Sequence, residues 1–174
     1  MSTDGRFARG GAADYARRQG NEGSVIRERI TAALKAAATE QDRRRACMLR
    51  LIGTAVRDRD QACRDLGKDG ISDDDILNLL LTMQKQREEQ ARAYEESGQH
   101  ALAETERREI EVLREFLPPQ LDEAAVHSAC AEVVRDIGAQ GLRDVGRTMT
   151  ALKERYPGRM DFSRASGVVK KLLG

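Results

Sequence analysis

The sequence predicts an all-α protein in two helical subdomains, and three observations support this. Aromatic residues make up only 3% of the 174 residues and Trp is absent, so the core must be built from aliphatic side chains. Charged residues make up 34%, and this mixture suits amphipathic helices better than sheets, which favour β-branched and aromatic residues. Finally, Pro118-Pro119 interrupts the helical pattern, because proline lacks a backbone N–H and pushes the preceding residue out of the α region.

Residues 24–117 are predicted to form a four-helix region that contains one long helix, preceded by a flexible tail at residues 1–23. The starts of the first three helices are marked by side chains whose oxygens can accept a hydrogen bond from a free backbone N–H. Three aspartates in the first turn of the third helix also face the positive end of its dipole. The predicted helices are 25–40 after Ser24, 43–66 after Asp42, 73–96 after Ser72, and 102–116 beyond a polar turn that includes His100.

Residues 118–174 are predicted to form a three-helix bundle, because their apolar side chains recur every three or four residues. Asp122 and Asp161 are expected to cap the first and last of these helices, and Gly138 and Gly158 end the first two. The side chains expected to point inward are Val126, Cys130, Val133 and Ile137, then Leu142, Val145, Met149 and Leu152, and then Phe162, Ala165, Val169 and Leu172.

Charge is sorted along the chain although the net charge is only +1. Residues 69–117 carry 13 acidic and 6 basic side chains, whereas residues 138–174 carry 8 basic and 3 acidic ones. The basic end predicts a phosphate-binding face for a folded RNA, since no aromatic residues interleave with the charges to stack on single-stranded bases. We expect six residues to form this face as one continuous surface: Arg143, Arg147, Lys153, Arg155, Lys170 and Lys171.

Two further features have open interpretations. Arginines 43, 44 and 45 begin the second helix, where positive charge opposes the dipole, and arginines 50, 57, 59 and 64 follow; they form either a solvated face or a binding surface. Gly146 disfavours the helix that contains it, which indicates the close approach of a neighbouring helix or a ligand.

No arrangement of residues typical of catalysis is evident. His100 and His127 are the only histidines, and neither has a partner at metal-ligand spacing. The sequence contains no phosphate-binding glycine loop, so we expect no catalytic residue, cofactor or metal. Cys47, Cys63 and Cys130 are widely spaced and are expected to be buried free thiols in a reducing compartment. No apolar run approaches the roughly 20 residues that span a bilayer, and we expect a cytoplasmic protein.

Several motifs resemble those of the YqeY family. The segment Arg143-Asp144-Val145-Gly146-Arg147-Thr148-Met149 is similar to the family pattern K-D-M-G-K-V-M, with arginine in place of both lysines. Gly158-Arg159-Met160-Asp161 resembles its G-x-x-D turn, Val168 to Leu173 its V-x-x-L-L helix, and Phe116 to Leu121 its E-x-L-P-x-Q-L hinge. The resemblance covers about residues 25–174.

The resemblance implies a fold of two helical subdomains similar to the tail of the GatB subunit of glutamine-dependent tRNA amidotransferases. That tail grips the tRNA body, while a separate domain performs the chemistry of a carbon–nitrogen ligase with glutamine as amido donor. A chain that resembles only the tail is expected to be a non-catalytic tRNA-binding adaptor, with tRNA, amidotransferase subunits or a tRNA synthetase as partners. The alternative is a protein-interaction module that uses the acidic long helix, Asp73 to Glu96. The oligomeric state stays open.

Overall fold

The computed structural model describes residues 25–174, and in this range it contains helices and no strands, which confirms the predicted all-α class. The expected tail at residues 1–23 and the cap at Ser24 lie outside the described residues. The elements are α2 (Val25–Thr39), α3 (Arg43–Asp65), α4 (Asp73–Glu96), α5 (His100–Arg114), α6 (Glu123–Asp136), the 3₁₀ helix η1 (Leu142–Asp144), α7 (Val145–Arg155) and α8 (Phe162–Leu173).

The helix caps predicted at Asp42, Ser72, Asp122 and Asp161 are confirmed. The Asp42 side chain accepts from the backbone N–H of Arg45 at 3.0 Å, and the Asp122 side chain accepts from Ala125 at 2.7 Å. At the start of α4, Ser72 and Asp75 exchange side-chain and backbone hydrogen bonds, so two free N–H groups are satisfied together. Most boundaries agree within one residue, but α5 begins at His100 itself, ends at Arg114 and has no side-chain cap.

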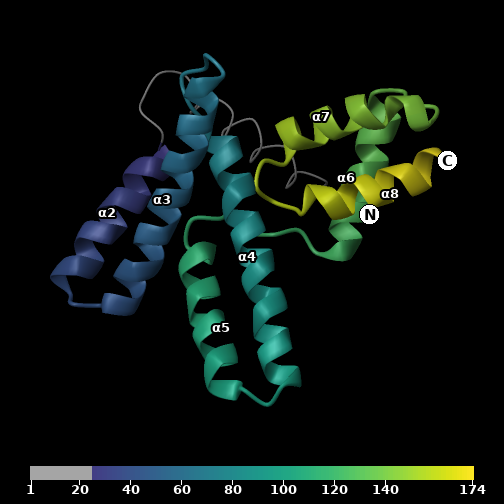
Figure 1. Ribbon diagram of the computed structural model, residues 1–174. Coiled ribbons are helices and arrows are strands. Elements are labelled where there is room, and N and C mark those ends of the chain that lie inside the picture. Colours follow the sequence, from purple (N-terminus) through teal and green to yellow (C-terminus); the bar gives the residue numbers. More distant parts are fainter. Residues whose placement is uncertain (1–24) are drawn as a thin grey trace, which may run out of the picture.

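The first four helices of the described range, α2 to α5, form two pairs (Figure 1). Helices α2 and α3 lie side by side, and so do α4 and α5, which form a long hairpin. A single hydrophobic cluster connects the two pairs, and its fully buried members include Leu49 and Ile52 from α3, Ile76 and Leu80 from α4, and Leu113 from α5.

A buried ion pair holds α2, α3 and the segment before α4 together. Arg27 donates to both carboxylate oxygens of Asp60, at 2.6 and 2.8 Å, and also to the carbonyl of Ile71 at 2.8 Å. The backbone N–H of Ile71 donates to Asp60 at 2.9 Å. Hydrogen bonding from Arg27 is the main reason that the pKa of Asp60 lies below its usual value, although burial opposes this shift.

Helices α6, α7 and α8 pack around a second cluster that shares no member with the first. Cys130, Val133, Leu152 and Val169 are fully buried in it. The expectation that Leu142 and Leu172 point inward is wrong, since they are 61% and 37% exposed. Leu142 lies in η1, ahead of the regular α-helical spacing, and Leu173, four residues after Val169, packs on the cluster instead. The exact division of the chain into subdomains stays a prediction.

The loop between α7 and α8 joins the two clusters, and Figure 1 shows it beside α4. The Gln120 side chain donates to the carbonyl of Gly158 at 2.7 Å, and the N–H of Leu121 donates to the carbonyl of Arg159 at 2.8 Å. Gly158 has φ +65° and is buried so tightly that an added Cβ would lie 2.8 Å from the Cβ of Leu77. The α7–α8 loop thus packs closely against α4 at Gly158.

Candidate nucleic-acid interface

A surface groove of about 970 Å³ runs between α4 and the C-terminal helices. The middle of α4 forms one wall, and the start of α6, the end of α7 and one face of α8 form the other. Charged side chains of both signs line it. The basic ones are Lys85, Arg92, Lys153, Arg164 and Lys171, and the acidic ones are Glu88, Glu89, Glu123 and Asp161.

Two of the six residues predicted from the sequence meet in this groove. Lys153 comes from the last turn of α7 and Lys171 from the last turn of α8, and both are exposed. Neither ammonium group has a carboxylate partner among residues 25–174. Gly167, one turn before Lys171, also lines the groove, and an added Cβ there would meet nothing within 4 Å. A phosphate group in the groove could therefore approach the main chain of α8 at Gly167.

The two walls of the groove are connected by an ion pair between Lys85 of α4 and Asp161, whose atoms lie 3.2 Å apart. Asp161 also caps α8 by accepting from the backbone N–H groups of Ser163 at 2.8 Å and Arg164 at 3.4 Å. Burial alone would raise the pKa of Asp161, but the hydrogen bonds from Ser163 and Lys85 outweigh it and lower the pKa. Asp161 thus stays ionised and fixes the position of α8 relative to α4.

Two other predicted residues contact the C-terminal end of α6 instead of the groove. Arg147 donates to the carbonyl of Ile137 at 2.7 Å, and Arg155 pairs with Asp136 at 2.6 Å. The hydrogen bond to Asp136 raises the pKa of Arg155 above its ordinary value. Positive charge at a helix C-terminus is favourable because it meets the negative end of the dipole. These two arginines therefore stabilise the packing of α7 against α6.

Arg143 and Lys170 are exposed at the opposite end of the bundle from the α7–α8 loop. Arg143 lies in η1, which packs on α8, the helix that carries Lys170. The six predicted residues thus fall into separate groups: two in the groove, two at the end of α6, and two near η1. That the six side chains form one continuous basic surface stays a prediction; on α7, Arg147 contacts the end of α6 and Lys153 lines the groove.

The interpretation of Gly146 as a place of close helix packing is wrong. Gly146 lies in the first turn of α7 and is exposed, and an added Cβ would meet nothing within 4 Å. The open space at Gly146 is compatible with the approach of a ligand but not with a closely packed neighbouring helix.

Much of the acidic charge of α4 and α5 is paired within the hairpin. Arg87 contacts both Glu106 and Glu109, and it is the most buried arginine of these pairs. Glu95 pairs with Arg107. The long helix therefore presents less free negative charge than its sequence predicts.

Several residues of the groove were not predicted from the sequence. Lys85 and Arg92 belong to a helix that is acidic overall, and Gly167 has the sequence context of an ordinary helix. The sequence could have indicated Gly167 by its neighbours, because one basic residue precedes it by three positions and another follows it by four. Cys47 was expected to be buried and is exposed, whereas Cys130 is buried in the second cluster, where burial raises the pKa of its thiol.

Within the described range, no helix is both long and apolar enough to cross a membrane. In the same range, no three His, Cys, Asp or Glu side chains come close enough together to hold a metal ion.

The fold and the groove define a helical protein with a charged surface groove between two hydrophobic clusters. A family model describes this class more closely. The sequence matches the model of Yqey-like proteins over residues 27–173, and the chain therefore belongs to this family. The resemblance to the YqeY family that the motifs indicated is confirmed. No curated protein matches the sequence.

Proposed function

We propose that the chain is a non-catalytic adaptor that binds tRNA in the cytoplasm through the groove between α4 and α8. The observation that carries this proposal is that Lys153 and Lys171, from two different helices, line one groove beside Gly167. Lysines without internal partners can neutralise backbone phosphates and release counterions, which favours binding to any folded RNA. The likeness to the GatB tail that the YqeY resemblance implies favours tRNA as that RNA, and tRNA amidotransferase subunits or a tRNA synthetase as the proteins that receive it.

The test is tRNA binding by the full chain at several salt concentrations, with Lys153→Gln/Lys171→Gln as the variant. Losing two phosphate contacts should lower the slope of log affinity against log salt by roughly 1.4 to 1.8. The control is Arg107→Gln/Arg108→Gln, which removes the same charge from α5, where both arginines have glutamate partners. The proposal is refuted if the lysine variant keeps the slope of the unmodified chain.

Arg147 and Arg155 are unsuitable for this test because their removal would also disturb the end of α6. A role in amidotransferase chemistry is tested separately: the rate of tRNA-dependent amide transfer by the partner subunits should depend on added chain. The alternative, a protein-interaction module based on α4, is favoured if the chain binds no tRNA at any salt concentration.

A further inference from the structure

The exposed side of α3 carries a row of arginines that the groove does not use. Arg43, Arg50, Arg57 and Arg64 follow one another at intervals of seven residues. Seven residues cover two helical turns minus about 20°. Successive arginines are therefore rotated by only about 20° around the helix axis, and the four side chains lie along one side of α3. At about 1.5 Å per residue, neighbouring arginines are about 10.5 Å apart and the row is about 31 Å long.

These four arginines differ from those that stabilise the fold. All four are exposed, and within residues 25–174 none forms an ion pair. In contrast, Arg45 on the same helix pairs with Glu115. Of the three aspartates in α3, Asp60 is the buried partner of Arg27, Asp65 accepts from Gln61, and Asp58 is exposed. The row thus lacks ion pairs in the described range, although Arg57 donates to the Thr54 hydroxyl at 3.1 Å and Arg64 lies near enough to Asp60 to lower its pKa.

Gly53 provides a second, independent observation. It lies in the interior of α3, where glycine disfavours the helix relative to alanine. An added Cβ would meet nothing within 4 Å, so no neighbour among residues 25–174 requires glycine at this position. It stands three residues after Arg50 and four before Arg57, on the same side of the helix. A ligand backbone held by the two guanidinium groups could thus lie directly against the main chain of α3.

The same spacing occurs in the groove. Gly167 follows Arg164 by three residues and precedes Lys171 by four, and it too has open space around its Cα. Two helices thus carry a glycine between two basic residues on one face, and in the described part of the chain no contact explains either glycine.

We propose that the exposed face of α3, with Arg43, Arg50, Gly53, Arg57 and Arg64, is a second phosphate-binding surface that takes the backbone of an RNA duplex. Its row of charges is of the order of one duplex turn, which is roughly 34 Å in B-form DNA and somewhat shorter in A-form RNA. Arginine binds phosphate bidentately, and the row has no aromatic side chain for base stacking, which favours paired over single-stranded RNA. This inference rests on the proposed function, since it assigns a second contact to RNA binding.

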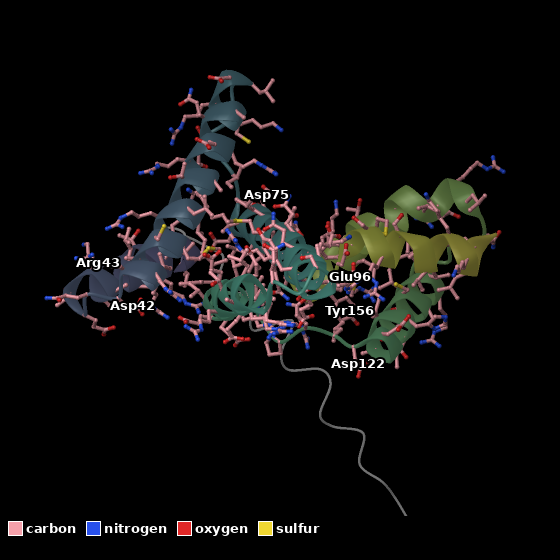
Figure 2. All side chains as sticks on the ribbon, turned by 60° about the horizontal axis from the view of Figure 1, so that its bottom comes forward. Asp42, Arg43, Asp75, Glu96, Asp122 and Tyr156 are labelled. Atoms are coloured by element: carbon pink, nitrogen blue, oxygen red, sulfur yellow. The ribbon has the colours of Figure 1, made fainter. Side chains whose placement is uncertain are left out.

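The surface is distinct from the groove. Figure 1 shows α3 on the side of α4 and α5 away from α6, α7 and α8, and in Figure 2 Arg43 lies far from Asp122 and Tyr156. One RNA that touches both surfaces would have to extend around the α4–α5 hairpin, and two RNA segments could also bind separately.

The experiment measures binding of an RNA hairpin with a stem of about 12 base pairs, and of unfractionated tRNA, to the full chain at about 50 and 200 mM salt. The variant Arg50→Gln/Arg57→Gln removes two of the proposed phosphate contacts. Between the two salt concentrations the unmodified chain should lose about tenfold more affinity for the hairpin than this variant does. The control is again Arg107→Gln/Arg108→Gln.

A second variant, Gly53→Gln, separates a binding role from a structural one. Glutamine is a better helix former than glycine, so Tm should rise, while the longer side chain should obstruct the RNA backbone and weaken binding. A higher Tm with unchanged hairpin binding would overturn the proposed close approach.

The outcomes also separate this inference from the proposed function. If Lys153→Gln/Lys171→Gln weakens tRNA binding and Arg50→Gln/Arg57→Gln leaves both RNAs bound as before, the groove stands and the α3 surface is wrong. If the unmodified chain binds neither RNA, the proposed function is refuted and this inference with it.

Discussion

Replacing Gly158 with alanine should strongly destabilise the protein, for two additive reasons. Gly158 has φ +65°, and a residue with a side chain loses about 1–2 kcal/mol in this left-handed region. The new Cβ would also lie 2.8 Å from the Cβ and Cδ1 of Leu77 and 3.1 Å from its Cγ. Leu77 is only 1% exposed and has little room to move, so the overpacking costs about 1–3 kcal/mol more. We expect a loss of about 2–5 kcal/mol in the free energy of unfolding.

Two other glycines provide matched controls for the two parts of this estimate. Gly138 has φ +63° with nothing within 4 Å of an added Cβ, so Gly138→Ala should cost only the conformational part, about 1–2 kcal/mol. Gly146 lies in a regular helix with equally open space, so Gly146→Ala should stabilise the protein by about 1 kcal/mol.

The assay is urea unfolding followed by circular dichroism at 222 nm, a wavelength that reports helix content. If Gly158→Ala destabilises the protein no more than Gly138→Ala, the predicted clash with Leu77 does not occur and the reasoning fails. A double-mutant cycle with Leu77→Ala gives a further check: the combined variant should lose less than the sum of the single losses, because the smaller side chain removes the clash.

Three further predictions concern ionised groups. Asp60→Asn should cost about 2–3 kcal/mol, because the buried charged acceptor of two Arg27 hydrogen bonds is lost, whereas Asp58→Asn on the exposed side of α3 should change the free energy of unfolding by less than about 0.5 kcal/mol. The folded-state pKa of Asp60 lies below its unfolded value, so the stability that ionised Asp60 contributes is present above about pH 4 and is lost as the pH falls through the folded-state pKa. Urea midpoints measured from about pH 5 to pH 2 should therefore decline more steeply for the unmodified chain than for Asp60→Asn. Equal slopes would contradict this. Asp161→Ala should be about 1 kcal/mol less stable than Asp161→Asn in the same urea assay, since asparagine keeps a cap for α8 and alanine does not; equal stabilities would show that the cap contributes nothing.

The helices and their caps could be predicted because they depend on residues close together in the sequence. Asp42, Ser72, Asp122 and Asp161 each accept from a backbone N–H two or three residues further on. The groove could not be predicted, because its walls come from distant parts of the chain: Lys85 and Asp161 are 76 residues apart. Pro118-Pro119 indicates where the chain turns, but it contains no information about which faces then meet.

The same limit explains which charged residues could be assigned a role. Composition and spacing identify arginines, but they do not separate those with an internal partner from those without one. The structure makes this separation: Arg155 pairs with Asp136, whereas Arg50 and Arg57 have no carboxylate partner in the described part of the chain. Removing a paired arginine leaves its acidic partner uncompensated and should lower stability, while removing an unpaired one should change mainly the binding of an anionic ligand. The tests on Lys153, Lys171, Arg50 and Arg57 are informative for this reason, since a loss of RNA binding without a loss of stability cannot come from a damaged fold.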